Sequence, residues 1–464
     1  MKSRSFTVAV AAMAALLAVV PGRAQNASRL NVLFIPVDDL NHWVGYFGRN
    51  AQVKTPNIDR LAARGVRFTR AYAAAPICNP SRTAVLSGMR PSTTGVYDQE
   101  TDWRTSIPAD KTLPTQFRNA GYFVGGAGKV YHFNRPTDWE VYMRPRAMGE
   151  QQTGERGERV DPLFNIKPFD GRDEDLPDHE ITSWIAEQLG KKHDRPFFLA
   201  CGLLKPHLPW KVPRRFYEMY PPDKIPMPPY QEKDLEDIPP AGVAVANPKG
   251  DHAKILELGR WKETMQAYAA AVSYADMNVG RVIEALDRSP YRDNTIIVLW
   301  GDHGWHLGEK HHWRKQTLWE EGVRAPLIWI APGVTKAGGV CERTVDFLTL
   351  YPTLLDLCGI PIPKHVEGKS IRSLLVNPKA AWDLPAVSTY LFGNHAVRTE
   401  GWRYIRYNDG GEELYDETKD PYEWTNRAAE PGLASIKAQL ARWLPKINNH
   451  APEGSHIPGL PPDR

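Results

Sequence analysis

Four runs made almost wholly of hydrophobic residues stand out along this chain. They cover residues 30–37, 196–204, 295–300 and 325–330 and are rich in aliphatic and aromatic side chains. Strands with one face in water alternate hydrophobic and polar residues, whereas strands covered on both faces read as continuous runs. We therefore expect these segments to be strands of a mainly parallel sheet that helices cover on both sides.

Segments with helical spacing lie between the runs. Residues 55–65 combine a capping Thr55, Pro56 in the first turn and a closing Gly65. Residues 113–119 and 261–286 also carry hydrophobic side chains at helical spacing. The alternation of strands and helices predicts an α/β fold.

The pattern changes after about residue 365. Residues 396–399, 402–407 and 413–416 alternate as short strands do, and residues 433–444 return to helical spacing. We expect a small antiparallel sheet with one packed helix, attached to the main domain. Three further stretches are predicted to be extended or loose: the proline-rich segment 205–240, much of 140–178, and the tail 452–464.

The first 24 residues have the pattern of a secretory signal peptide. Lys2 and Arg4 precede the apolar segment 6–20, and small residues follow it up to Ala24. This apolar segment is about 15 residues long, which is short for a membrane span of ~20. An uncleaved anchor is the alternative reading, and no later stretch is apolar enough to cross a bilayer. We expect export to the periplasm, the extracellular space or an equivalent lumen, without stable membrane insertion.

The composition is that of a globular protein. Of 464 residues, 42% are hydrophobic and 24% charged, and the net charge is only +4. So small a charge, without a basic run, argues against a nucleic-acid partner. Four cysteines are too few for a disulfide scaffold. Cys201 lies in an apolar run and is expected in the core, Cys341 and Cys358 are either paired or free, and Cys78 needs another explanation.

Acidic residues follow two of the predicted strands. Asp38 and Asp39 end the first run, and Asp302 and His303 follow the third. Ligands of open α/β sheets bind at the carboxyl ends of the strands. Three carboxylates gathered there would repel one another unless a cation joined them. A single aspartate at such a place more often caps the next helix, but the double aspartate with a matching Asp-His favours a metal site.

The segment around Cys78 carries the most specific motif. Cys78-Asn79-Pro80-Ser81-Arg82 is followed by Leu86-Ser87-Gly88. Pro80 can begin a helix, whose first N–H groups would favour an anion, and Arg82 would lie close enough to hold one. The motif resembles the signature of the type I sulfatases, in which the cysteine is oxidised to formylglycine. The alternative is a free thiol near a helix start.

The resemblance extends over nearly the whole mature chain and is closest to the iduronate-2-sulfatase group. It is carried by short segments spread along the sequence: residues 37–40, 92–98, 103–104, 128–132, 205–207, 301–305, 413–416 and 420–421. It implies an alkaline-phosphatase-like α/β core over residues 27–365. It also implies a C-terminal subdomain over residues 366–464 with a four-stranded antiparallel sheet.

The resemblance also implies roles for individual residues. One Ca²⁺ would be held by Asp38, Asp39, Asp302, His303 and an oxygen of the modified Cys78. The calcium and Arg82 would stabilise the hydrated aldehyde that attacks sulfur. Four further residues would act on the substrate: Lys129 and Lys315 would hold the sulfate oxygens, His207 would protonate the departing sugar oxygen, and His132 would assist sulfate elimination.

Each of these residues has a simpler alternative. Nitrogen is a less usual ligand for calcium than oxygen, so His303 either binds the ion or lies outside its ligands. Lys315 could be a solvated lysine, His132 a loop histidine, and His207 a packed side chain.

The predicted function is hydrolysis of a sulfate ester on a carbohydrate, such as a 2-O-sulfated uronic acid. Such an enzyme requires a formylglycine-generating maturation enzyme as a partner. Two alternatives remain: a phosphate or phosphonate monoester hydrolase of the same superfamily, and an inactive glycan-binding relative.

Overall fold

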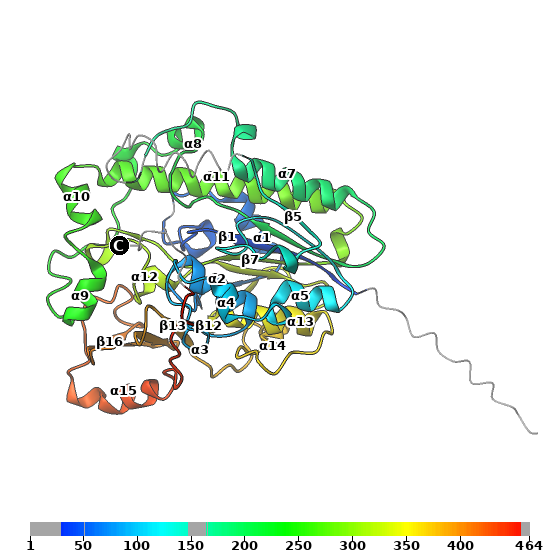
Figure 1. Cartoon of the computed structure of the whole chain (residues 1–464). Helices are drawn as coiled ribbons and strands as arrows, with labels where there is room; N and C mark the ends of the chain where they lie inside the picture. Colours follow the sequence, from blue (N-terminus) through cyan, green and yellow to red (C-terminus); the bar gives the residue numbers. More distant parts are fainter. Residues whose placement is uncertain (1–28, 51, 147–163, 165, 456–464) are drawn as a thin grey trace, which may run out of the picture.

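The computed structural model describes residues 29–50, 52–146, 164 and 166–455 (Figure 1). The predicted signal peptide and most of the predicted loose tail lie outside the described residues. Within the described residues, no helix is both long enough and apolar enough to span a membrane.

An eight-stranded sheet forms the centre of the molecule. In spatial order its strands are β11 (Gly339–Cys341), β2 (Val66–Phe68), β10 (Leu327–Ile330), β7 (Thr295–Gly301), β1 (Asn31–Val37), β6 (Phe197–Gly202), β4 (Phe123–Gly128) and β5 (Val141–Met143). All neighbouring pairs are parallel except those of β10, which runs antiparallel to β2 and β7. All four predicted strands are present, and the sheet is mainly parallel as expected.

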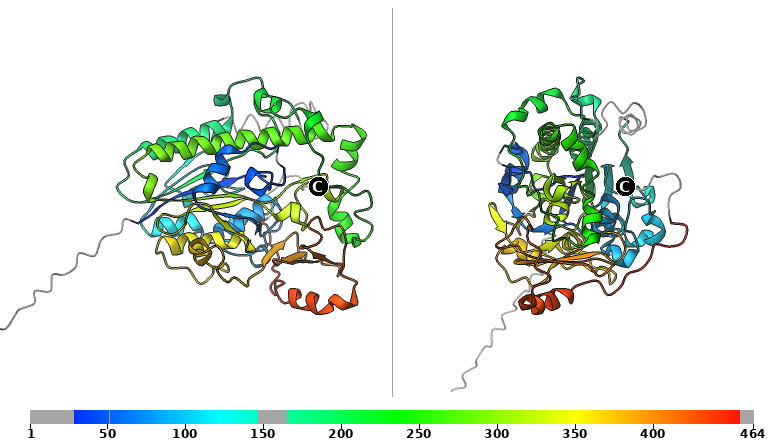
Figure 2. Two further views of the ribbon diagram at one scale, coloured as in Figure 1. Left: turned by 180° about the vertical axis from the view of Figure 1, so that it is seen from behind. Right: turned by 90° about the vertical axis from the view of Figure 1, so that its left-hand side faces the viewer.

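Helices cover both faces of this sheet (Figures 1 and 2). Successive residues of β1 point to opposite sides, so Leu33 and Ile35 pack in one core cluster while Val32 and Phe34 pack in the other. The first cluster includes α1 (Pro56–Arg64), α7 (Pro177–Gly190) and α11 (Trp261–Arg288). The second includes α2 (Cys78–Ser87), α5 (Leu113–Asn119), α13 (Leu350–Leu357) and α14 (Arg372–Val376). This double covering explains the continuous hydrophobic runs, and the three predicted helices are confirmed as α1, α5 and α11.

A second sheet lies beside the main domain, near the orange helix of Figure 1. Its four antiparallel strands are β13 (Ala386–Thr389), β14 (His395–Arg398), β15 (Trp402–Arg406) and β16 (Glu412–Asp416). One face packs against α15 (Ala434–Ala441), and the other packs against Trp319 and Ile238 of the main domain. The small antiparallel sheet and its helix are therefore confirmed, whereas the boundary between residues 365 and 366 stays a prediction.

The predicted surface loop 205–240 differs from expectation. It contains the short helix α8 (Arg214–Glu218), and Trp210 and Phe216 pack into the core against α11. The high proline content fixed the backbone without keeping it at the surface, because large aromatic side chains between the prolines bury apolar area.

All four cysteines are buried and none forms a disulfide. Cys201 is buried in β6 as expected, and Cys341 and Cys358 are both buried and unpaired.

Candidate active site

Most of the predicted residues follow the carboxyl ends of four adjacent parallel strands, β7, β1, β6 and β4. Asp38 and Asp39 follow β1, and Asp302 and His303 follow β7. Lys129 follows β4, and His207 lies shortly after the end of β6. The parallel direction of these strands therefore brings together side chains that are far apart in the sequence.

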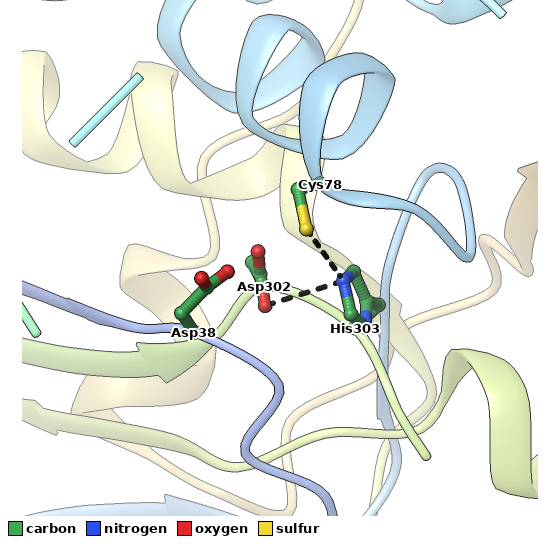
Figure 3. A group of neighbouring side chains, drawn as sticks. All are labelled: Asp38, Cys78, Asp302 and His303. Atoms are coloured by element: carbon green, nitrogen blue, oxygen red, sulfur yellow. Dashed lines mark hydrogen bonds and ion pairs between the residues drawn. The ribbon is translucent and has the colours of Figure 1, made fainter. Parts of the chain in front are cut away.

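Cys78 lies at the first turn of α2 and is fully buried. Its Sγ is 3.3 Å from Nε2 of His303, 3.1 Å from Nζ of Lys315 and 4.0 Å from Oδ1 of Asp39. Figure 3 shows Cys78 pointing from its helix toward the residues that follow β1 and β7. The predicted nucleophile is thus at the centre of the cluster.

The helix begins at Cys78 itself, two residues before the proline that was expected to start it. The side chain of Gln99 accepts a hydrogen bond from the backbone N–H of Asn79 at 2.8 Å. Asn79 in turn donates its side-chain amide to the carbonyls of Asp98 and Thr101, both at 2.8 Å. These bonds fix the helix start from outside, so at least one of its N–H groups is already engaged and is not free for an anion.

Arg82 lies one helical turn after Cys78 and is fully buried. It donates to Oδ2 of Asp302 at 2.8 Å and to Oδ1 of Asp38 at 3.0 Å. The same guanidinium also donates to the carbonyls of Lys129 and Val130. Arg82 therefore joins the ends of β1, β7 and β4, and its direct partners are the acids and carbonyls around Cys78.

Two lysines approach the cluster from different segments. Nζ of Lys129 is 2.5 Å from Oδ2 of Asp38, and Nζ of Lys315 is 2.7 Å from Oδ1 of Asp39. Burial would raise the pKa of Asp38, but Lys129 and Arg82 hold it well below its usual range. Burial would lower the pKa of Lys315, but the Asp39 carboxylate raises it well above its usual range. Lys315 is therefore a buried ammonium beside Cys78, and the solvated alternative is wrong.

The two remaining histidines lie at the periphery. Nε2 of His207 is 3.9 Å from Oδ2 of Asp39, and its Nδ1 is 2.6 Å from the carbonyl of Leu208. Burial lowers the pKa of His207 to about 4. Burial, and then the charge of Lys129, hold the pKa of His132 well below its usual value. His132 is half-buried, and its Nδ1 has no hydrogen-bond partner among the described residues.

The unmodified thiol is poorly suited to attack. Burial raises the pKa of Cys78 to about 12, so the sulfur stays protonated at neutral pH. A protonated thiol is a weak nucleophile and a weak metal ligand. The cluster of cations around Cys78 therefore fits a different group at this position better than it fits the thiol.

The donor atoms fit a hard cation. Asp38, Cys78, Asp302 and His303 each offer a ligand atom within 4.8 Å of the others, and Asp39, Cys78 and His207 form an overlapping group. Oδ2 of Asp39 is buried and has no hydrogen-bond partner among the described residues. Three carboxylates suit an ion such as calcium, which binds oxygen ligands in a flexible geometry. Nδ1 of His303 is 2.9 Å from the carbonyl of Gly304, which leaves Nε2 directed at the cluster.

Two contacts escaped the sequence reading. Ser81 donates its hydroxyl to the carbonyl of Asp302 at 2.5 Å, and its place inside the Cys78 motif is a signal that could have found it. Tyr268 of α11 donates to the carbonyl of Asp39 at 2.8 Å. Tyr268 lies in the middle of a long helix, where periodicity identifies it only as a core residue.

Comparisons with known proteins identify the family. The sulfatase family model matches residues 30–360, and a model described as N-sulphoglucosamine sulphohydrolase, C-terminal, matches residues 308–450. A sulfatase of Formosa agariphila is 40% identical over 448 residues, covering 91% of this chain and 88% of its own length. Iduronate 2-sulfatase of Mus musculus is 32% identical over 390 residues, covering 72% of this chain and 69% of its own length.

A solved structure, described as a 2-O GAG sulfatase, superposes with a TM-score of 0.72 at 25% identity over 90% of this chain and 91% of its own. The fold is that of the sulfatases, with an alkaline-phosphatase-like core and a small C-terminal antiparallel sheet, as the sequence predicted. The chain therefore belongs to the sulfatase family and is a sulfuric ester hydrolase.

Proposed function

We propose that this sulfatase hydrolyses a 2-O-sulfate ester on a uronic acid residue of a carbohydrate, using formylglycine made from Cys78. The observation that carries the proposal is the placement of Cys78 Sγ within 3.1 Å of Lys315 Nζ and 3.3 Å of His303 Nε2. A side chain at position 78 can contact Lys315 and the carboxylates at the strand ends at the same time. Formylglycine, as its hydrate, supplies there an oxygen nucleophile that a buried thiol cannot match.

The metal ligands in this proposal are Asp38, Asp39, Asp302 and His303, together with an oxygen at position 78. A bound Ca²⁺ supplies positive charge that lowers the pKa of the nucleophile and neutralises developing negative charge. Arg82 orients Asp38 and Asp302, since it donates to both carboxylates. This fixed arrangement needs little reorganisation when substrate binds.

Lys129 and Lys315 hold the sulfate oxygens. Lys315 is buried and Lys129 is half-buried, and each ammonium group contacts one carboxylate oxygen of the cluster. An ammonium carries three donors, so each lysine can keep its aspartate and still donate to sulfate. Their charge stabilises the transition state, in which negative charge accumulates on the sulfate and the leaving oxygen.

His207 is the proposed proton donor to the departing sugar oxygen. Its side chain is 30% exposed, which supports an approach of the remainder of the substrate from this side, and its Nδ1 is held by the carbonyl of Leu208. Its Nε2 is then directed inward. A bound sulfate would bring negative charge that favours protonation of this nitrogen. His132, whose Nδ1 has no partner among the described residues, would move a proton when sulfate departs.

Similarity to two named proteins supports the choice of a 2-O-sulfate ester as substrate. Iduronate 2-sulfatase and a 2-O GAG sulfatase are both among the similar proteins. Export through the predicted signal peptide and modification by a formylglycine-generating enzyme complete the proposal.

Three measurements test it. Peptide mass spectrometry of protein from its native host should find residue 78 about 18 Da lighter than cysteine, which is the change from thiol to aldehyde. Calcium-loaded enzyme should release sulfate from a disaccharide bearing a 2-O-sulfated uronic acid and not from one sulfated only at glucosamine O6. Cys78→Ala should lose this activity, whereas a preference for aryl phosphate over aryl sulfate would favour the phosphate or phosphonate hydrolase instead.

A further inference from the structure

The segment that presents Lys315 has an unusual backbone. It is a hairpin of β8 (His306–Leu307) and β9 (Trp313–Arg314), joined by a turn that begins at Gly308. Four residues other than glycine have positive φ angles in or just after this hairpin, namely Lys310 (56°), His311 (50°), Arg314 (77°) and Gln316 (78°). Such conformations persist only where surrounding contacts enforce them. The contacts around Lys315 therefore determine its position more than local propensity does.

Lys315 lies between two of these residues and is held from both sides. The backbone N–H of Gln316 donates to the carbonyl of Pro76 at 2.9 Å, which ties the hairpin to the segment just before Cys78. On the other side, the carbonyl of Lys315 lies 2.6 Å from Nε2 of His312. The side chain itself packs over the Trp305 ring at 5.6 Å from Nζ to the ring centroid.

His312 connects Lys315 to a different element. Its Nδ1 lies 2.7 Å from the carbonyl of Ala246, the last residue of α9 (Pro240–Ala246), and its ring meets that of His306 edge-on. His312 is 8% exposed, so water cannot easily replace these contacts. Carbonyl oxygens only accept hydrogen bonds, so the two contacts together require a ring with both nitrogens protonated. Burial lowers the pKa of His312, whereas the carbonyls of Ala246 and Lys315 favour the protonated ring.

We propose that His312 is a positioning residue, which fixes the backbone of Lys315 by bridging its carbonyl to the end of α9. The inference rests on the proposed function, because the grip of Lys315 on sulfate is part of that proposal. His312 itself does not touch the strand-end cluster: its ring nitrogens bond the two backbone carbonyls. Its effect on catalysis therefore has to pass through Lys315.

A double-mutant cycle tests this dependence. His312→Phe keeps a ring of similar size and removes both donors, and Lys315→Ala removes the ammonium. Two quantities are measured: kcat/KM for an aryl sulfate in matured enzyme, and the affinity for inorganic sulfate by calorimetry in a Cys78→Ala background, which does not depend on maturation. We expect His312→Phe to lower both by about tenfold, because a held lysine becomes loose. When Lys315 is already alanine, His312→Phe should change kcat/KM and the sulfate affinity each by less than about twofold.

Two further variants separate positioning from stability. His312→Gln keeps one amide donor and should recover part of the loss. Lys310→Met is a matched control in the same turn: Lys310 is buried, and its ammonium pairs with Asp234 at 2.6 Å and donates to the carbonyl of Glu423, away from Lys315. We expect it to lower the melting temperature at least as much as His312→Phe does, with a smaller loss of kcat/KM and of sulfate affinity.

The outcomes distinguish this inference from the function on which it rests. If Lys315→Ala keeps full activity and sulfate affinity, the proposed role of Lys315 fails and His312 loses its target. If Lys315→Ala loses activity and sulfate affinity, and His312→Phe causes its full further loss of both in that background, only the positioning role of His312 is overturned. Equal losses of kcat/KM in Lys310→Met and His312→Phe would likewise show general loosening of the hairpin.

Discussion

Tyr268 donates its hydroxyl hydrogen to the carbonyl oxygen of Asp39 at 2.8 Å, and its oxygen accepts the N–H of Asn41 at 3.0 Å. Asp39 has a φ of 58°, a left-handed conformation that is unfavourable for most residues other than glycine. One buried tyrosine of α11 thus holds the backbone on both sides of the turn after β1. The direction of the Asp39 carboxylate depends on this turn.

Tyr268→Phe should therefore loosen a predicted metal ligand without touching it. The variant leaves the buried Asp39 carbonyl without this donor and the Asn41 N–H without this acceptor, which costs about 1–3 kcal/mol of folding free energy. Urea denaturation should show a free energy of unfolding that is lower by this amount. Added calcium should raise the melting temperature of the variant by less than it raises that of the wild type. Tyr274→Phe, on the same helix and equally buried, is the control, since the Tyr274 ring packs edge-on against Phe216 of α8. An unchanged calcium response in Tyr268→Phe would contradict the positioning of Asp39 by Tyr268.

The strands that the sequence revealed are those buried on both faces by aliphatic side chains. β4 was missed because its sequence is glycine-rich, and the structure explains why. A Cβ on Gly126 would lie 2.8 Å from the ring of Trp139, so glycine is required by close packing and breaks the hydrophobic pattern. The antiparallel direction of β10 also escaped prediction, since a hydrophobic run carries no sign of its direction.

The site was predictable where one segment carries its own signal. Asp38 and Asp302 end hydrophobic runs, and Cys78 and Arg82 share a specific motif. The contacts of Tyr268 depend on how α11 packs over the turn after β1, and no local pattern encodes that packing. Other contacts between a side chain and a backbone carbonyl far away in the sequence are equally hard to predict from a local pattern.

Arg82→Lys tests whether charge alone suffices at this position. The guanidinium donates to two carboxylates and two carbonyls, whereas a lysine has one nitrogen and cannot reach all four. Lys129 still pairs with Asp38, but the loss of the other donors to the two buried carboxylates should lower the free energy of unfolding by about 3–5 kcal/mol. Misplacement of the proposed metal ligands should lower kcat/KM at least about 100-fold. Guanidinium denaturation and an aryl sulfate assay measure the two effects, and a fully active Arg82→Lys enzyme would show that only the charge matters.

Removal of calcium should destabilise the protein through the strand-end carboxylates. At a calcium concentration 100 times its dissociation constant, binding adds about 2.7 kcal/mol to the folded state. We expect the melting temperature to fall in EGTA and to recover when calcium is restored. Asp39→Asn should need more calcium for the same recovery, because the variant replaces a carboxylate oxygen that has no hydrogen-bond partner among the described residues.

Asp276→Asn provides the control for this calcium titration. Asp276 is a buried carboxylate on α11 that accepts from the backbone N–H groups of Asn57 and Ile58, at the start of α1. Its replacement should lower the melting temperature while leaving the calcium-dependent increment unchanged. If Asp276→Asn and Asp39→Asn lose the calcium response equally, the ion does not bind at the ends of β1 and β7.

Arg403 holds the C-terminal sheet to the main domain, and its removal should destabilise the protein in a pH-dependent way. It is fully buried on β15, where it pairs with Glu417 at 3.2 Å and with Glu320 and Glu423 at shorter distances. Arg403→Met leaves three buried carboxylates with less compensating charge, which should cost about 3–5 kcal/mol. Burial already raises the pKa values of Glu417 and Glu423, and losing the guanidinium raises them further.

A carboxyl group with a raised pKa in the folded state favours folding at low pH and loses that advantage as the pH rises through the folded pKa. The gap in unfolding free energy between wild type and Arg403→Met should therefore be larger at pH 8 than at pH 5. Denaturant titrations at both pH values measure it. Arg343→Met, which breaks an exposed pair with Glu400 near the same boundary, should change stability little and equally at the two pH values, because water screens that pair. A gap for Arg403→Met that does not grow with pH would mean that the three glutamates find other partners once the arginine is gone.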